Sequence, residues 1–168
     1  LRTFLLIKET CFVTQKDIRV KKRNGRLQEV NLDKINKCVQ RASTNLENVS
    51  VSEVVLDASL QLYDKITTSE IDKALIMSAR SKIEKEPNYS YIAARMLLNN
   101  LYKEVFGEAV DSDIFEFLYR KSFCENIKRL VKVGTLSKKL LGFDLKLLAE
   151  SLSICRDKNF KYLGIQTL

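Results

Sequence analysis

The scarcity of residues that interrupt helices is the feature that most constrains the fold of this chain. The 168 residues include 1 proline and 5 glycines. These two residue types are the strongest local breakers of regular structure, so a chain with few of them favours helices joined by short connections. The chain is 45% hydrophobic and 30% charged, which is an ordinary globular composition. The sequence therefore predicts a mainly α-helical protein of one domain, or of one domain and part of another.

A short β-hairpin is expected ahead of the helices. The dipeptide Asn24-Gly25 is typical of a type I′ turn, and β-forming residues flank it on both sides. We expect two strands, at about 18–22 and 27–30. Three consecutive cations stand directly before the turn: Lys21, Lys22 and Arg23.

Helical periodicity follows the hairpin. Four amphipathic segments predict helices at about 32–46, 50–63, 67–84 and 89–106, and Gly107 is expected to end the fourth. We therefore expect a short β-hairpin that caps a four-helix bundle. Further helices are predicted at about 111–133 and 144–153. The tail around 162–164 is apolar, and we expect a following domain to cover it.

Local signals support these helices. Asn31 is typical of an N-cap, and Thr67 with Glu70 forms a capping box ahead of the third helix. The fourth helix is apolar on most sides, which is typical of a helix in the middle of a bundle. Arg95 on this helix then needs a polar partner. Lys82 is expected on the exposed face of the third helix.

Composition also excludes several kinds of chemistry. The chain has no histidine, so it cannot contain a Ser-His or Cys-His nucleophile pair or a histidine metal ligand. The cysteines are far apart and form no zinc-site spacing, so we expect neither a metal site nor a disulfide framework. Cys38 is expected in the core. The four cysteines are Cys11, Cys38, Cys124 and Cys155. This cysteine usage predicts a reducing, cytoplasmic compartment.

The charge and the chain ends indicate the broad setting. A formal net charge of +8 fits an anionic partner. No apolar run approaches the roughly 20 residues that a membrane span needs. The chain opens at Leu1 without an initiator methionine and stops at Leu168 in an apolar segment. We therefore expect it to be part of a longer protein.

The basic hairpin and the helix start after it form the candidate site. A glycine turn lets backbone approach a ligand, Lys22, Arg23 and Lys34 supply charge, and a helix N-terminus adds a partial positive charge. Such a cluster predicts binding of a polyphosphate, although neither a P-loop nor a Rossmann glycine pattern is present. A basic turn of this kind is also typical of a solvated surface, and it could contact nucleic-acid phosphates. No helix-turn-helix, zinc-finger or RNA-binding aromatic pattern supports nucleic acid.

Two motifs in the right order, the first of them in two segments, resemble a known family. Residues 20–25 read VKKRNG and residues 30–35 read VNLDKI, and residues 87–95 read PNYSYIAAR. This pattern resembles the ATP-cone, a small regulatory domain at the N-terminus of many ribonucleotide reductase large subunits. The resemblance is strong over 18–107 and continues more weakly to residue 168. The third segment resembles the aerobic, class I type.

The resemblance implies a nucleotide site and the role of each residue in it. The implied residues are Lys22, Arg23, Gly25, Asn31, Lys34, Thr68, Asp72 and Lys103. Lys22 and Arg23 are expected at the phosphates, and Lys103 is expected to reach them from the fourth helix. Thr68 corresponds to a residue near the base and the ribose. The implied effector is ATP or dATP, with Mg²⁺ and without a metal bound by side chains of this chain.

Two positions depart from the family pattern. Gln28 stands where an acidic residue is common, and Asp72 stands where a histidine can occur. A carboxylate at position 72 cannot donate a hydrogen bond as an imidazole does, and it would repel phosphate if it pointed inward.

The resemblance also implies the organisation of the whole protein. We expect an N-terminal extension over 1–17, a cone over 18–107 and the helical start of the reductase body over 108–168. The catalytic barrel with its cysteines would lie beyond residue 168, so no catalytic residue is expected in this chain. The implied partners are a second large subunit and a radical-generating small subunit. The cone of a transcriptional repressor of reductase genes is an alternative, although Cys11 alone cannot form the zinc ribbon of such a repressor.

Overall fold

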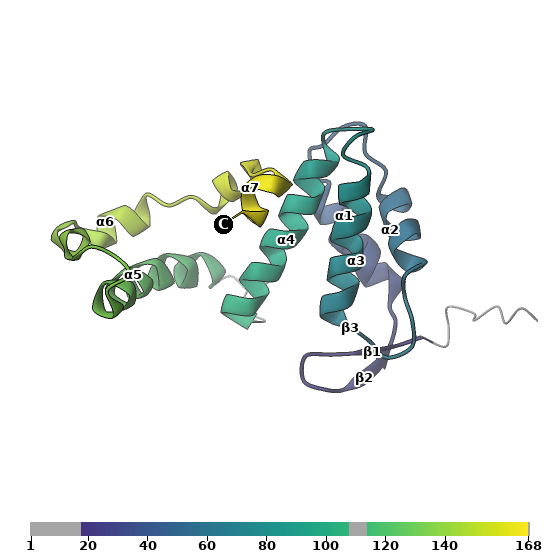
Figure 1. The fold of residues 1–168 in the computed structure, drawn as a ribbon, viewed down its shortest axis with the longest axis horizontal. Coiled ribbons are helices and arrows are strands. Elements are labelled where there is room, and N and C mark those ends of the chain that lie inside the picture. The colour runs from purple at the N-terminus through teal and green to yellow at the C-terminus, as the bar shows by residue number, and fades with distance from the viewer. Residues whose placement is uncertain (1–17, 108–113, 168) are drawn as a thin grey trace, which may run out of the picture.

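The computed structural model describes residues 18–107 and 114–167, so the predictions for 1–17 and for the segment just after Gly107 lie outside the described residues. The chain is mainly helical, as predicted, with a small sheet at one end (Figure 1). The elements in chain order are β1 (Arg19–Lys21), β2 (Leu27–Glu29), α1 (Leu32–Ala42), α2 (Val51–Ser59), β3 (Ile66–Thr67), α3 (Thr68–Ser81), α4 (Tyr89–Phe106), α5 (Phe115–Val133), η3 (Lys138–Gly142), α6 (Leu145–Glu150), η4 (Ile154–Asn159) and α7 (Tyr162–Gln166).

The sheet has three strands in the order β2-β1-β3. β1 pairs antiparallel with β2, with Val20 opposite Gln28, and parallel with β3, with Val20 opposite Ile66. The third strand was missed by the sequence analysis because it is two residues long and runs directly into the capping box of α3. Its pairing with β1 brings the start of α3 next to the hairpin. Helix α3 and the basic turn thereby become neighbours.

The turn between β1 and β2 differs from the predicted type I′. The Gly25 amide donates to the Lys22 carbonyl at 2.9 Å, and the Lys22 amide donates to the Arg26 carbonyl at 2.9 Å. These bonds close a three-residue loop. Gly25 has a φ of +80°, whereas Asn24 has no positive φ as a type I′ turn requires. The Asn24 side chain instead accepts a hydrogen bond from the Arg26 amide at 3.1 Å, which stabilises the longer loop.

Helices α1 to α4 surround the main hydrophobic core. Helix α4 packs against α3 and α1, while α2 packs against α1 and α3. The largest side chains that are completely buried come from all four helices and from β3: Val39, Val54, Ile66, Leu75 and Ile92. The first half of α4 is buried on most sides, as its sequence predicted. Its second half leaves Leu101 and Val105 exposed.

The predicted helix starts are confirmed by their caps. The Asn31 side chain accepts from the Lys34 amide at 2.9 Å and caps α1. Thr67 and Glu70 form the capping box of α3, because the Glu70 carboxylate accepts from the Thr67 amide at 2.8 Å and the Thr67 hydroxyl accepts from the Glu70 amide at 3.2 Å. Such caps satisfy amides that the helix itself leaves without partners. Gly107 ends α4, also as predicted, with a φ of +62°.

Two helices end earlier than predicted. Helix α1 stops at Ala42 instead of residue 46, because Asn45 in the predicted last turn has a φ of +61°. A left-handed residue such as Asn45 cannot continue a right-handed helix. Helix α2 stops at Ser59 instead of residue 63, because the chain then tightens into turns in which the Gln61 and Leu62 amides donate to the carbonyls of Ala58 and Ser59, three residues back.

Two polar side chains among the helices have defined partners. Arg95 on α4 donates to the carbonyls of Ala42 and Thr44, at 2.8 Å each, and so ties α4 to the end of α1. The prediction that Arg95 needs a partner is therefore confirmed. The prediction that Lys82 is exposed is wrong, because Lys82 is buried just after α3 and its ammonium group donates to Asp57 on α2.

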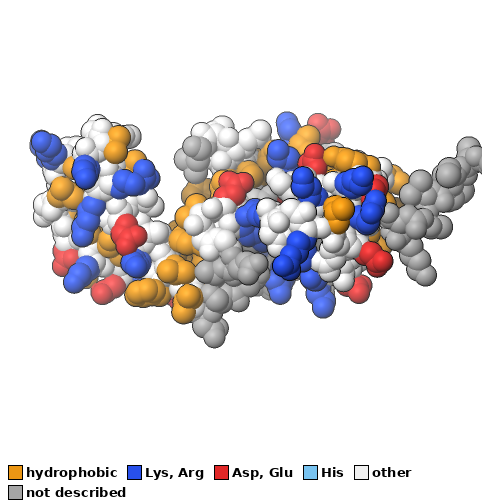
Figure 2. Space-filling view, turned by 90° about the horizontal axis from the view of Figure 1, so that it is seen from below, with side chains coloured by type: hydrophobic (Ala, Val, Ile, Leu, Met, Phe, Trp, Pro, Cys, Tyr) orange, Lys and Arg blue, Asp and Glu red, His pale blue; other side chains and the backbone are white. Residues whose placement is uncertain are grey.

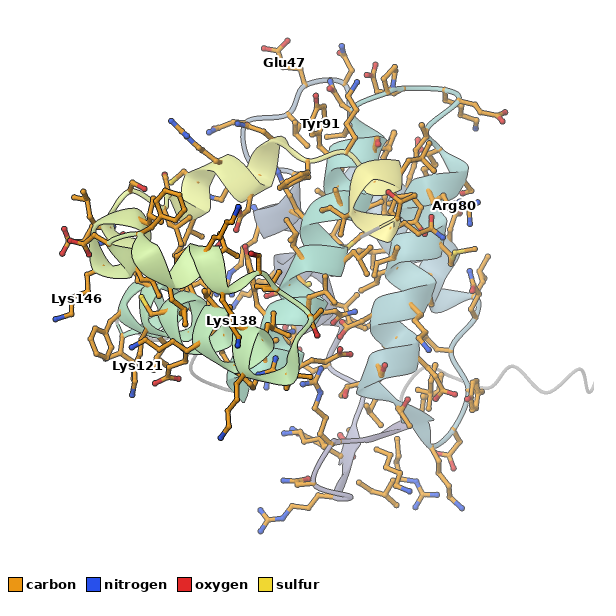
Figure 3. All side chains as sticks on the ribbon, turned by 60° about the vertical axis from the view of Figure 1, so that its left-hand side comes forward. Glu47, Arg80, Tyr91, Lys121, Lys138 and Lys146 are labelled. Carbon is orange, nitrogen blue, oxygen red and sulfur yellow. The ribbon has the colours of Figure 1, made fainter. Side chains whose placement is uncertain are left out.

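The end of the chain folds back onto α4. Helix α7 packs against α4, and Tyr162 and Ile165 are each 5% exposed. The Tyr162 amide donates to the buried Ser90 hydroxyl at 3.1 Å. Figure 3 shows Arg80 of α3 beside α7, and its guanidinium lies 5.6 Å from the Tyr162 ring centre. The expectation that this tail lacks a covering within the chain is wrong for Tyr162 and Ile165.

Helices α5 and α6 pack on each other and extend away from the core (Figure 1). Their connection to α4 includes a polar contact in which the Asp157 carboxylate of η4 accepts from the Tyr102 hydroxyl and, at 3.0 Å, from the Tyr119 hydroxyl. Within the described ranges, no helix is long and apolar enough to cross a membrane.

Candidate functional site

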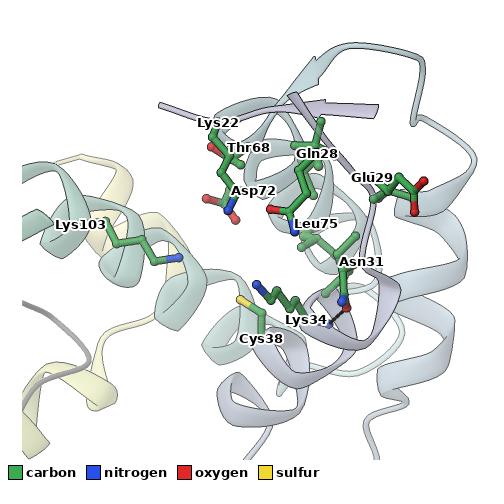
Figure 4. Close-up of a pocket in the computed structure, with 14 residues that line it drawn as sticks. Lys22, Gln28, Glu29, Asn31, Lys34, Cys38, Thr68, Asp72, Leu75 and Lys103 are labelled. Atoms are coloured by element: carbon green, nitrogen blue, oxygen red, sulfur yellow. Dashed lines mark hydrogen bonds between the residues drawn. The ribbon is translucent and has the colours of Figure 1, made fainter. Parts of the chain in front are cut away.

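A pocket lies where the hairpin meets α1, α3 and the last turn of α4 (Figure 4). Its volume is about 250 Å³. Strands, loops and three helices that are distant in sequence all contribute to its wall. The lining residues are Val20, Lys22, Gln28, Glu29, Val30, Asn31, Lys34, Ile35, Cys38, Thr68, Ile71, Asp72, Leu75 and Lys103.

Three lysines reach this pocket from three different elements. Lys22 begins the hairpin loop, Lys34 lies in the first turn of α1 and Lys103 lies in the last turn of α4. Figure 4 shows the side chains of Lys34 and Lys103 directed into the space between α1, α3 and α4. Cations that converge in this way can bind a ligand that carries several negative charges.

Two helix N-termini border the same space. Asn31 caps α1 with its side-chain oxygen on the Lys34 amide, and Thr68 is the first residue of α3. The starts of α helices carry amides without intrahelical partners and a partial positive charge, so they favour anions. The parallel pairing of β1 and β3 is what places the start of α3 here. The tertiary structure therefore adds a second helix terminus to the one that the sequence analysis identified.

Arg23 and Gly25 are predicted site residues that do not line the pocket. The Arg23 guanidinium turns to α4 and donates to the Lys103 carbonyl at 2.9 Å. This bond holds the hairpin loop against the last turn of α4, beside the lysine that enters the pocket. Gly25 has a φ of +80° in the turn, so its place in the structure is conformational. The pocket thus brings together Lys22, Asn31, Lys34, Thr68, Asp72 and Lys103.

Asp72 is the carboxylate among the predicted site residues. It lies one helical turn after Thr68 on α3, is half-buried, and faces the pocket near Lys22 (Figure 4). Burial raises the pKa of Asp72 above its ordinary value, while the charges of Lys103 and Arg23 act in the opposite direction. Burial is the larger influence. The surrounding cations therefore do not fully compensate for the loss of water around this carboxylate.

The apolar part of the wall was not predicted as part of a site. Ile71 and Leu75 are buried in the core, as the periodicity predicted, and Ile35 packs against that core; all three also line the pocket. Cys38 was also expected in the core, but it is half-buried in the pocket wall. Periodicity marks which face of a helix is apolar, but it does not reveal where that face meets a cavity. Gln28 also lines the pocket, and the register of the hairpin could have identified it as a lining residue, because it lies opposite Val20, another residue of the wall.

The pocket therefore combines a cationic rim with an apolar wall. Figure 2 views the molecule from the side of the hairpin and shows Lys and Arg side chains on this face both at the hairpin end and over α5 and α6, with acidic side chains among them. No group of three or more His, Cys, Asp or Glu residues that could hold a metal occurs in the part of the chain that the structure describes. Chemically, the arrangement can bind a molecule that has a polyanionic end and an apolar end.

Residues 18–104 match the family model of the ATP cone domain. The match covers slightly more than half of the chain and includes every predicted site residue. The chain belongs to the ATP-cone family.

Longer proteins with similar sequences carry one common name. The chain is 40% identical to the ribonucleoside-diphosphate reductase subunit alpha of Helicobacter pylori over 152 aligned residues, and the alignment covers 90% of this chain and 18% of that protein. It is 33% identical to the same subunit of Buchnera aphidicola subsp. Schizaphis graminum, over 96% of this chain and 20% of that protein. It is 32% identical to the ribonucleoside-diphosphate reductase 1 subunit alpha of Salmonella typhimurium, over 89% of this chain and 19% of that protein. The chain thus spans about a fifth of the length of these relatives.

Proposed function

We propose that residues 18–107 bind ATP or dATP in this pocket and thereby regulate a ribonucleotide reductase of which the chain is the N-terminal region. The observation that carries the proposal is the convergence of Lys22, Lys34 and Lys103 on one hollow that two helix N-termini also border. Scattered surface lysines would not share a cavity. A site with several cations and helix starts is suited to a triphosphate more than to a single phosphate.

Each part of the pocket has a role in this proposal. The three lysines and the start of α1 bind the phosphates. The apolar wall, which includes Ile71 and Leu75, packs against the base, and Thr68 lies near the base and the ribose. Arg23 acts indirectly, because its bond to the Lys103 carbonyl fixes the end of α4 against the hairpin loop.

The wider setting is inferred from the relatives. Their shared name supports a reductase large subunit as the parent protein, with the catalytic barrel outside this chain. We infer the division into an extension (1–17), a cone with a four-helix bundle (18–107) and the start of the body (108–168). A second large subunit and a radical-generating small subunit would be the partners, in the cytoplasm. Effector exchange can regulate such an assembly only if ATP and dATP stabilise different global states.

Isothermal titration calorimetry of the full chain with ATP and with dATP tests the proposal. The full chain is required because α7 packs on α4 and contributes Tyr162 to the core. We expect Lys34→Ala to weaken binding of both nucleotides by about 1–3 kcal/mol, the range for losing a charged hydrogen-bond partner. That range corresponds to a roughly 5- to 150-fold increase in Kd.

A lysine on the same helix provides the matched control. Lys37 is exposed on α1 and does not line the pocket, so Lys37→Ala should leave both affinities within about twofold. Circular dichroism must show the same helix content in all three proteins. Absence of heat with the wild type at millimolar nucleotide, or equal losses in the two variants, would contradict the proposed site. A nucleic-acid-binding surface would instead bind oligonucleotides in both variants, with a steep dependence on salt.

A further inference from the structure

The Asp72 carboxylate is the one feature of the pocket that opposes a polyphosphate ligand. It faces the pocket and is half-buried. Within residues 18–107 and 114–167, no side chain or backbone group forms a hydrogen bond or an ion pair with it, although Lys103 and Arg23 act on it through their charge. Burial removes part of the water around this carboxylate, and a hydrogen-bond or ion-pair partner would replace that water. Its position in a cationic pocket without such a partner indicates that the partner arrives with the ligand.

The other carboxylate of the lining is arranged differently. Glu29 lines the pocket rim, but Figure 4 shows its carboxylate turned away from the lysines and from Asp72. Glu29 is exposed, so water can solvate its charge. Asp72 alone would therefore meet the negative charge of a bound triphosphate inside the pocket, and a triphosphate without a counter-ion would be repelled there.

We propose that Asp72 is a ligand of a Mg²⁺ ion that enters the pocket bound to the phosphates of the nucleotide, which departs from the expectation that no side chain of this chain binds the metal. This inference rests on the proposed function. Mg²⁺ in proteins is usually held by one or two carboxylates together with substrate phosphates, and it keeps several waters. A divalent cation between Asp72 and the phosphates converts a repulsive contact into an attractive one.

The neighbouring residues fit this role. Asp72 lies one turn after Thr68 on the same face of α3, and both line the pocket, so a metal held by Asp72 would lie between the Thr68 end of the site and the lysines that bind the phosphates. The described residues include no group of three potential metal ligands, so the protein side chains alone do not complete a site. The nucleotide must supply the remaining oxygens. Metal and nucleotide therefore bind together, and Mg²⁺ without nucleotide binds weakly.

Calorimetry with and without the metal tests this inference. The wild-type chain, Asp72→Asn and Glu29→Gln are each titrated with ATP in excess Mg²⁺ and, separately, with ATP in EDTA. The wild type should bind the Mg²⁺ complex at least about tenfold more tightly than metal-free ATP. Asp72→Asn should bind metal-free ATP more tightly than the wild type does, and it should lose most of the preference for Mg²⁺. Glu29→Gln should keep the wild-type preference.

Electron paramagnetic resonance of Mn²⁺, a substitute for Mg²⁺, gives a readout that does not depend on affinity alone. In the presence of ATP the Mn²⁺ spectrum should differ between the wild type and Asp72→Asn, and Asp72→Ala should repeat the effect of Asp72→Asn. Equal wild-type affinities for the two forms of ATP would overturn the inference while leaving the nucleotide site intact. The inference is also overturned, with the nucleotide site intact, if Asp72→Asn weakens binding of metal-free ATP and of the Mg²⁺ complex by the same factor. If no form of ATP binds the wild type, the proposed function itself fails.

Discussion

Replacement of Tyr162 by alanine tests whether the end of the chain belongs to the same folding unit as the cone. Tyr162 is 5% exposed and joins the core cluster formed by α1 to α4. Its ring lies under the Arg80 guanidinium at 5.6 Å, and its amide donates to the Ser90 hydroxyl at 3.1 Å. If these contacts are integral to the fold, Tyr162→Ala must destabilise the whole chain.

The magnitude follows from what the substitution removes. Truncation of a buried aromatic side chain to alanine costs about 3–5 kcal/mol, and an exposed cation–π contact contributes about 0.5–1 kcal/mol within such a total. Helix α7 is five residues long, so the site can partly collapse around the smaller side chain. We therefore expect a loss near the lower limit, about 3 kcal/mol. For a chain of this size, that corresponds to a decrease in Tm of roughly 6–12 °C.

Urea denaturation of the full chain, followed by circular dichroism, measures this loss. Leu163 is the matched control, because it neighbours Tyr162 on α7 and is 66% exposed. Leu163→Ala should change the free energy of unfolding by less than about 0.5 kcal/mol. If Tyr162→Ala and Leu163→Ala have the same small effect, α7 does not stabilise the core, and residues 18–107 form an independent unit.

Two further predictions concern ion pairs. Asp57→Ala should destabilise the chain by about 1–3 kcal/mol, because it leaves the buried Lys82 ammonium without its main partner. Lys82→Met should be close to neutral, because Asp57 is 43% exposed and water can solvate it. Urea denaturation of both variants distinguishes these outcomes. Hydrogen bonds from Arg19 lower the pKa of Asp64 to about 2, below its ordinary value, so this pair stabilises the fold above about pH 4 and loses that effect as the pH falls toward 2. The difference in Tm between the wild type and Asp64→Asn should therefore decrease as the pH falls from about 4 to 2. A difference that stays constant over this range would contradict the stabilising role of the pair.

Local sequence signals predicted the elements because the relevant physics is local. The N-cap at Asn31 and the capping box of Thr67 and Glu70 each act within four residues, and both are present as predicted. The turn type was mistaken because Asn24-Gly25 is compatible with more than one loop length. The three-residue loop that forms includes Arg23, which donates a hydrogen bond to the distant Lys103 carbonyl, and this contact is not visible in the local sequence.

Features that depend on distant pairing could not be predicted from one sequence. The exposure of Lys82 was predicted from its own helix, but Asp57 on another helix makes burial of the ammonium tolerable. The two-residue strand β3 carries no periodicity of its own, yet its pairing with β1 places Thr68 at the pocket. The candidate site shows the same division. Its cations were identified by motif, whereas its apolar wall emerges only where helix faces meet.

The most direct test of the central claim is to locate the bound nucleotide by NMR. The 19.4 kDa chain, labelled with ¹⁵N, is titrated with ATP and Mg²⁺, and changes in amide chemical shift are mapped onto the sequence. We predict the largest changes at Lys22, Lys34, Thr68 and Lys103, which the hairpin loop and three helices bring to one pocket, and small changes along α5 and α6. Changes concentrated on α5 and α6, or none at millimolar ATP, would contradict the claim that these residues form one nucleotide-binding site.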